Sequence, residues 1–156
     1  MNRTIGMLSA GFAFLGVVLG AMGAHALKGS VEGLADAADR LRWWETGARY
    51  HLTHALALGF TAVVAHHVTS KAPRVAAGLF IAGILIFSGS LYVMGLTGIR
   101  GLGAITPIGG FAQLGGWLTF TAMGVSHRLL AMFMLSPELD GAPTRWTFRL
   151  GTLALA

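Results

Sequence analysis

The chain has 156 residues, of which 54% are hydrophobic and only 11% are charged. A soluble domain carries roughly a quarter charged residues, so this composition indicates that lipid is the main solvent of the chain. Cysteine is absent, which excludes disulfides, thiolate metal sites and a cysteine nucleophile. The net charge of +5 comes from scattered Lys and Arg residues without a nucleic-acid motif, so basic loops between membrane helices explain it better than a nucleic-acid partner does.

Four apolar stretches are long enough to cross a bilayer, which takes about 20 residues. They span residues 4–27, 47–69, 73–97 and 109–134. The first stretch follows Arg3 and ends in a small-x-small sequence, as a cleaved signal peptide does, but its apolar core exceeds the ~7–15 residues of such peptides. We therefore expect it to be retained, and we predict an all-α fold in which residues 1–135 form a four-helix transmembrane bundle.

The segment 28–46 has a different pattern. Apolar residues recur at helical spacing along it, at Val31, Leu34, Ala38 and Leu41, with charged residues on the other side. Trp43 and Trp44 follow, and tryptophan favours the membrane–water boundary. The pattern predicts an amphipathic helix that lies in the interface between the first two spans.

Two glycine- or proline-containing segments remain. Residues 98–110, "GIRGLGAITPIGG", are predicted to be a connector, and their GxG spellings follow no strand, which excludes a dinucleotide-binding turn. Residues 136–156 begin with "SPELDGAP" and end in an apolar stretch flanked by Arg145 and Arg149. This tail is predicted to be an interfacial helix or a flexible segment.

Polar side chains gather where the predicted spans meet one leaflet. In an up-and-down bundle, odd helices end on the side where even helices begin. The leaflet opposite the N-terminus thereby receives His25, Tyr50, His51, His54, Ser88, Ser90, Tyr92, Thr106 and Gln113. A polar group left unpaired in hydrocarbon costs several kcal/mol. We therefore predict one polar cluster roofed by the 28–46 segment, in which His51 and His54, three residues apart, share a helix face.

The cluster is compatible with several functions. Its residues fit a packing module or accessory subunit whose helix ends are tied by hydrogen bonds, alone or as a homo-oligomer. They also fit a quinone, haem or metal site, since His25, His51 and His54 together offer three imidazoles. Transport is disfavoured because the central thirds of the spans carry no charge. No paired carboxylates or serine–histidine set can be placed in one site, which argues against an enzyme.

Four blocks of sequence also carry a family resemblance. They are "GAMGAHAL", "ARYHLTHALAL", "GLFIAGILIFSGSLYVMGL" and "GAITPIGGFAQLGGW". In this order they resemble the domain of unknown function 423 family, the YgdD-like and transmembrane protein 256-like small membrane proteins. The resemblance covers about residues 5–120 and implies a four-helix membrane architecture without implying an activity. By resemblance, the motif positions also include Gly89, Pro107, Gly109 and Gly110.

The distribution of basic residues indicates an orientation. With the N-terminus inside, six Lys and Arg residues are cytoplasmic and five are outside, which favours N-in and C-in by the positive-inside rule. The sequence therefore predicts a multi-pass protein of the cell (inner) membrane. His66 and His67 are adjacent and point about 100° apart, so they are expected to act as interfacial anchors rather than as one site.

Overall fold

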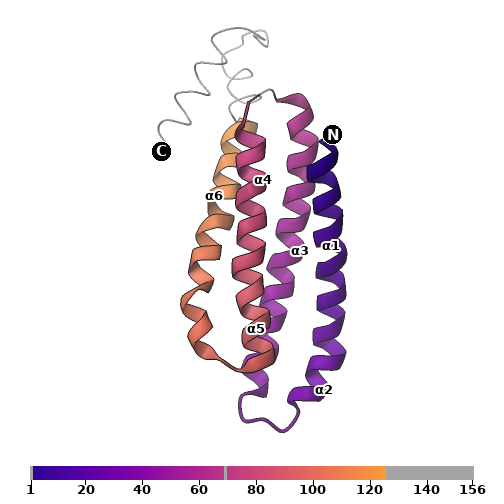
Figure 1. The fold of residues 1–156 in the computed structure, drawn as a ribbon, viewed down its shortest axis with the longest axis vertical. Coiled ribbons are helices and arrows are strands. Elements are labelled where there is room, and N and C mark those ends of the chain that lie inside the picture. Colours follow the sequence, from indigo (N-terminus) through magenta and orange to yellow (C-terminus); the bar gives the residue numbers. More distant parts are fainter. Residues whose placement is uncertain (1, 69, 126–156) are drawn as a thin grey trace.

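The computed structural model describes residues 2–68 and 70–125, and within them every regular element is helical. The elements form four long rods that lie side by side (Figure 1). In chain order they are α1 (Arg3–Met22), η1 (Gly23–Leu27) and α2 (Lys28–Val31); α3 (Ala37–His67); α4 (Ala72–Gly83), η2 (Ile84–Ser88) and α5 (Gly89–Thr97); and η3 (Arg100–Ala104) and α6 (Thr106–Gly124). The predicted all-α class is confirmed. The end of the predicted fourth span and the tail 136–156 lie outside the described residues.

Two of these rods are long enough and apolar enough to cross a membrane. The first runs over Arg3–Val31, with 29 residues, and the second over Ala72–Thr97, with 26 residues. Both are interrupted in their hydrogen-bond pattern by one π-helical turn, η1 in the first rod and η2 in the second. The backbone nevertheless stays helical through both turns, so each rod keeps its backbone groups bonded within the helix, as hydrocarbon requires.

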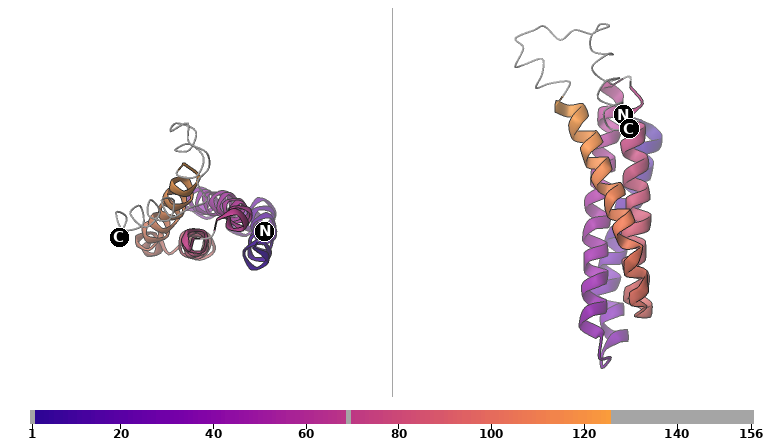
Figure 2. Two further views of the ribbon diagram at one scale, coloured as in Figure 1. Left: turned by 90° about the horizontal axis from the view of Figure 1, so that it is seen from above. Right: turned by 90° about the vertical axis from the view of Figure 1, so that its left-hand side faces the viewer.

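The rods pack in a chain of neighbours. α1 lies along α3; α3 lies along α4, η2 and α5; and α6 lies along α4 and η2. Seen from above, α1 and α6 are at opposite ends of the group, with α3 and α4 between them (Figure 2). α3 and the α4–α5 rod therefore form the centre of the molecule, and each has neighbours on two sides.

The predicted interfacial helix over 28–46 is wrong. Residues Lys28–Val31 prolong the first rod, a turn with Gly33 at φ 85° follows, and α3 then runs without a break from Ala37. Part of the apolar side of the segment packs on protein, whereas Leu34 and Ala38 are exposed. Its core cluster consists of Leu27, Val31 and Trp44, with Leu19, Ala37, Leu41 and Tyr92 packed around it.

Glycines allow α6 to approach the α4–η2 rod closely. A Cβ atom added at Gly83 would collide with the Gln113 side chain, and one at Gly109 would collide with the backbone of Phe87. At Gly116 the added atom would lie 2.7 Å from the Phe80 ring. Small residues of this kind let helices pack backbone to backbone in lipid. The "TPIGGFAQLGG" sequence is therefore a packing surface of α6.

Ion pairs join the elements at the end of the molecule opposite the N-terminus. Asp39 accepts hydrogen bonds from Arg42 and from Arg100, each at 2.9 Å. Arg40 pairs with Asp36 at 2.9 Å and also donates to the Leu96 carbonyl at the end of α5. These contacts tie the first turns of α3 to the connector between α5 and α6.

We expect Gly109→Ala to destabilise the bundle, whereas Gly110→Ala leaves it nearly unchanged. The methyl group at position 109 would meet the Phe87 backbone, which cannot move aside, while at position 110 it would lie at ordinary contact distance, 3.7 Å, from the Phe87 ring. Overpacking of this kind costs roughly 1–3 kcal/mol. Thermal unfolding of both variants in detergent tests this, and equal melting temperatures would contradict close backbone packing.

Candidate functional site

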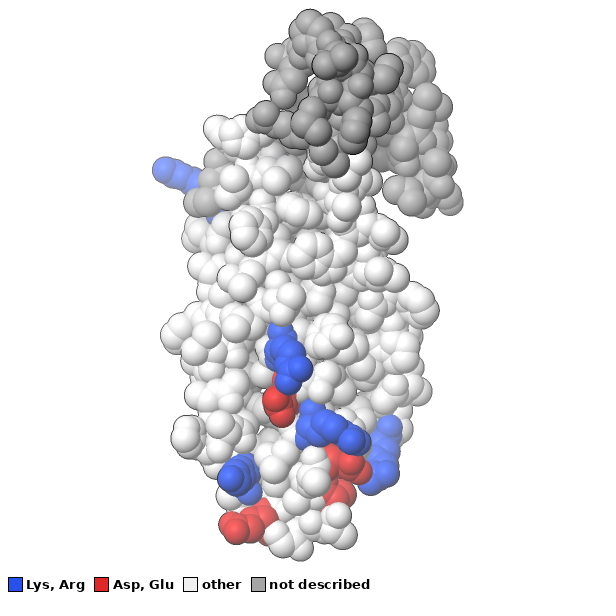
Figure 3. Space-filling view, turned by 180° about the vertical axis from the view of Figure 1, so that it is seen from behind, with Lys and Arg blue, Asp and Glu red and all other residues white. Residues whose placement is uncertain are grey.

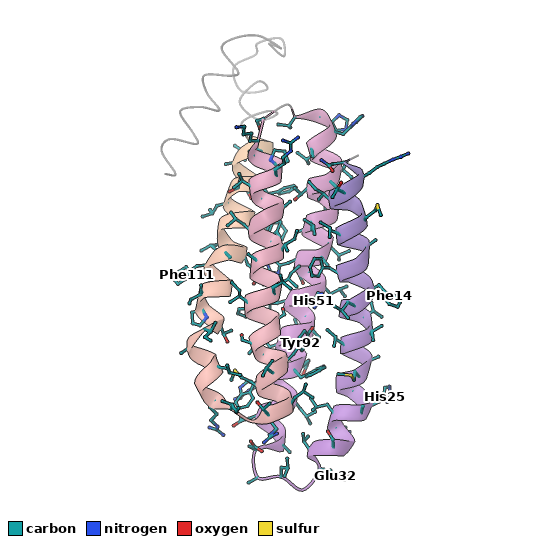
Figure 4. The ribbon with its side chains drawn as sticks, viewed as in Figure 1. Phe14, His25, Glu32, His51, Tyr92 and Phe111 are labelled. Atoms are coloured by element: carbon teal, nitrogen blue, oxygen red, sulfur yellow. The ribbon has the colours of Figure 1, made fainter. Side chains whose placement is uncertain are left out.

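His51 and His54 lie near the middle of α3 rather than at its start. Because α3 begins at Ala37 rather than at residue 47, His51 is fourteen residues into the helix, or about 21 Å from its start. Figure 4 shows His51 near mid-height and Tyr92 just below it, both between the rods. Both histidines are buried, with 3% of His51 and 4% of His54 exposed.

His54 has a hydrogen-bond partner on each ring nitrogen. Its Nδ1 lies 2.7 Å from the Tyr50 carbonyl, and its Nε2 accepts from the indole N–H of Trp117 at 3.1 Å. A carbonyl can only accept, so the imidazole is neutral and carries its proton on Nδ1. The ring stacks on Tyr50 with centroids 5.9 Å apart and lies edge-on to Trp117. With both nitrogens engaged, His54 is not free to ligate a metal or a haem iron.

His51 makes a different set of contacts. Its Nδ1 lies 3.3 Å from the Tyr92 hydroxyl, and its ring meets Phe12 edge-on at 5.8 Å. The ring also packs on Gly16 of α1, where a Cβ atom would lie at contact distance, 3.4 Å, from Cδ2 of His51. His51 Nε2 is buried, and it has no hydrogen-bond partner in the described part of the chain.

Trp44 extends the His51 contacts toward the end of the bundle. Its ring lies 4.7 Å from that of Tyr92, and its indole N–H donates to the Leu19 carbonyl of α1 at 2.7 Å. A Cβ atom at Gly23 would lie 2.5 Å from the indole nitrogen, so only glycine fits beneath the ring. Trp44 and His51 thus share one stripe of α3, as a helix that continues through residue 44 requires.

The structure divides the predicted cluster into two. The His51 cluster contains Phe12, Trp44, His51 and Tyr92 and lies among α1, α3 and α5. The His54 cluster contains Tyr50, His54, Phe80, Phe87 and Trp117 and lies among α3, α4, η2 and α6. Residues three apart are about 60° apart around a helix axis, and because α3 has neighbours on two sides, this angle directs the two histidines to different rods.

His25 does not join either cluster. It is exposed on η1, and its side chain points away from the bundle (Figure 4). The predicted gathering of His25 with His51 and His54 is therefore wrong. In residues 2–68 and 70–125 no three His, Asp or Glu side chains are grouped closely enough to hold a metal ion, so the three-imidazole site is not formed.

The remaining candidate residues form three groups: a bonded pair, two buried residues with an unpaired atom, and one partly exposed residue. Ser90 and Thr106 bond to each other through their hydroxyls at 2.8 Å and so link α5 to the start of α6. Ser88 and Gln113 are 0% and 3% exposed, and the Oγ of Ser88 and the Nε2 of Gln113 have no hydrogen-bond partner among the residues that the structure describes. Tyr50 is 43% exposed and forms the outer edge of the His54 cluster.

Sequence reasoning missed Trp117. It was treated as part of the apolar fourth span, although its indole N–H is the donor that satisfies His54. A signal for it exists in the sequence, because Trp117 is four residues after Gln113 and therefore shares its helix face. A tryptophan on the same face as a polar residue expected inside the bundle is a candidate hydrogen-bond donor.

The family of proteins of unknown function DUF423 matches residues 19–110, which is more than half of the chain. The chain belongs to the DUF423 family. Its matched region contains His51, His54, Ser88 and Tyr92, whereas Gln113 and Trp117 follow it. The resemblance drawn from the sequence is thereby confirmed.

A curated relative of this DUF423 chain is the UPF0382 membrane protein YwdK of Bacillus subtilis (strain 168), which is 41% identical over 77 residues. The match covers 48% of this chain and 58% of that protein, so it spans less than two thirds of the relative's length. No solved structure matches the chain. The relative and the two span-length helices together support a membrane protein of unestablished activity.

Substitution should separate the buried histidines from the exposed ones. We expect His51→Ala and His54→Ala to lower the melting temperature, since each empties a packed position and His54→Ala also leaves the Trp117 N–H without its acceptor, at about 1–3 kcal/mol. His66→Ala and His67→Ala, at the exposed end of the same helix, serve as matched controls. Equal losses in all four variants would contradict the structural role of the buried pair.

Proposed function

We propose that this DUF423 chain is a multi-pass integral membrane protein whose four rods all cross the bilayer as one transmembrane bundle. We further propose that it serves as a packing module, an accessory subunit of a larger membrane assembly. The observation that carries this proposal is the distribution of its surface groups. On the face seen in Figure 3, charged side chains lie in the lower half and one basic side chain lies near the upper end, with uncharged surface between them.

The uncharged surface involves every rod. Residues without Lys, Arg, Asp or Glu run over 4–27, 50–70, 75–99 and 101–124, each near the ~20 residues of a membrane span. Large apolar side chains point outward along them, with Phe14 73%, Phe60 64% and Phe111 73% exposed. Such a surface is unfavourable in water and is solvated in hydrocarbon, which supports a lipid-facing belt on all sides.

The length and composition criteria select neither α3 nor α6. In α3, the uncharged stretch from Tyr50 to His67 contains four histidines, and these lower its mean hydropathy. The charged residues lie in its first turns, up to Arg49. From Arg49 to His67 the helix rises about 27 Å, close to the ~30 Å hydrocarbon thickness. We propose that this upper part spans the membrane and that residues 37–49 extend beyond it, with Glu45 and Arg49 paired at 2.9 Å near the boundary.

The interior supports a structural rather than a catalytic role. Its polar groups are largely used to join rods, through His54–Trp117, His51–Tyr92 and Ser90–Thr106. α1 and α6 each have one main neighbouring rod, so both present a broad apolar face to which helices of other subunits can pack. We place the protein in the cell membrane with the N-terminus inside, as the positive-inside rule favours.

Membrane crossing by α3 can be tested with single cysteines, because the natural chain has none. Arg42 and Phe60 are similarly exposed on α3, at 73% and 64%. In sealed vesicles we expect Arg42→Cys to react with a membrane-impermeant maleimide from one side and Phe60→Cys to be protected. Both should react after denaturation. Equal labelling of the two in sealed vesicles would contradict a lipid-embedded Phe60.

The accessory role requires a partner at a fixed ratio. We expect the tagged protein, expressed at native abundance and extracted in mild detergent, to co-purify stoichiometrically with another membrane protein. Phe14→Ser and Phe111→Ser alter the outer faces of α1 and α6 respectively, and one of them should release that protein without lowering the melting temperature. Recovery of the chain only as a monomer or with copies of itself would contradict the accessory role.

A further inference from the structure

We propose that the seam where α3, η2 and α6 meet binds a neutral, lipid-soluble molecule with a flat ring and a carbonyl oxygen, the chemistry of a quinone. Ser88 and Gln113 are the groups that hold the carbonyl oxygen. This site goes beyond the accessory role proposed above and shares with it only the placement of the rods in the membrane.

The first observation is that these two residues are deeply buried and unpaired. Ser88 is 0% exposed and Gln113 is 3% exposed, yet Oγ of Ser88 and Nε2 of Gln113 lack hydrogen-bond partners in the described structure. A buried polar atom left in this state destabilises the folded protein. Of the neighbouring polar groups, Ser90 is bonded to Thr106 and His54 to Trp117. Nε2 of His51, which belongs to the separate His51 cluster, also lacks a partner among the described residues.

The second observation is that both residues face the same seam. The Gln113 side chain packs on Gly83, and Phe87 packs on Gly109, so the turn that carries Ser88 lies against α6. On its other side, the Ser88 carbonyl lies against α3, where a Cβ atom at Gly47 would be 3.4 Å away. Ser88 therefore sits where three rods meet.

Helix direction inclines the two side chains toward a common level of the bundle. Side chains tilt toward the N-terminus of their own helix, and α6 runs antiparallel to the α4–α5 rod. Gln113 is level with Gly83 and tilts toward the level of Phe87, while Ser88 tilts back toward the level of Gly83. η2 is also a π-helical turn, a feature that recurs at functional sites.

Aromatic rings separate these polar atoms from the lipid. Tyr50, which is 43% exposed, lies 4.8 Å from Phe87 by ring centroids, and Trp117 is 37% exposed on α6. His54 lies between Tyr50 and Trp117, since its ring stacks on the Tyr50 ring at 5.9 Å and its Nε2 accepts from the Trp117 indole. The rim of the seam is therefore made of flat, partly lipid-facing surfaces that suit a planar ring.

The available hydrogen bonds define the ligand chemistry. An amide nitrogen can only donate, and a serine hydroxyl can donate as well, so the complementary group is an acceptor. No Lys or Arg occurs in residues 50–70, 75–99 or 101–124, so nothing on these stretches of the rods neutralises a carboxylate or a phosphate. A neutral carbonyl oxygen on an apolar molecule satisfies both donors.

The test uses the full-length protein in phosphatidylcholine nanodiscs, with decylubiquinone as the probe. We expect the probe to raise the melting temperature of the natural protein in a saturable manner. Gln113→Leu should weaken the probe's apparent affinity about tenfold or more, as expected for one lost hydrogen bond, and should leave the unliganded melting temperature unchanged or higher. Ser88→Ala should act in the same direction.

Ser90→Ala is the matched control, because Ser90 is bonded to Thr106 rather than turned into the seam, and it should bind the probe like the natural protein. Absence of any response in the natural protein would overturn the proposal and would leave a lipid ester carbonyl or an adventitious water as the partner of these atoms. Unchanged probe affinity in Gln113→Leu would also overturn it. Neither result bears on maleimide protection or on co-purification, which test the accessory role separately.

Discussion

The membrane placement proposed above would leave the rods in hydrocarbon, which contains no water to accept or donate a hydrogen bond, and the structure is compatible with that constraint. Backbone groups meet it by staying helical through all four rods, including the π-helical turns η1 and η2. Side chains meet it by pairing across rods, as the Trp117 indole does with His54 and the Trp44 indole does with the Leu19 carbonyl. Hydrogen bonds between rods thus satisfy polar groups that water would satisfy on the surface of a soluble protein.

Pairing across rods depends on how closely the rods approach, and glycine sets that distance. A Cβ atom at Gly23 would collide with the Trp44 ring, and one at Gly83 would collide with the Gln113 side chain. Each of these polar or aromatic groups lies inside the bundle because a glycine on the facing rod leaves a space for it. These glycines and the buried side chains on the facing rods are therefore complementary packing surfaces.

Composition and periodicity predicted the helical class and the approximate position of each rod, because apolar runs of span length are strong local signals. They did not predict that residues 37–46 continue into α3, since an amphipathic stripe facing lipid and one facing another helix have the same spacing. Because α3 begins at Ala37 rather than at residue 47, His51 and His54 lie near the middle of the molecule rather than at its rim. Chain connectivity also placed His25 at the correct end, but it carries no information about the direction in which a side chain points.

The separation of His51 from His54 has a related cause. Spacing alone places both on one side of α3, and only the positions of α1 and α6 determine that they contact different neighbours. The sequence predicts that buried polar side chains form hydrogen bonds with one another, but it does not predict which side chains are the partners. Trp117 as the donor to His54 and the unpaired atoms of Ser88 and Gln113 emerge only from the packing of three rods.

Nitrogen-15 NMR of histidine-labelled protein in lipid bilayers gives the most direct view of this internal pairing. The structure predicts that His54 is neutral, with a protonated Nδ1 and an unprotonated, hydrogen-bonded Nε2 whose signal shifts in Trp117→Phe. A His54 ring protonated on Nε2, or on both nitrogens, would show that the indole of Trp117 does not donate to it and would contradict the pairing of polar side chains across the rods.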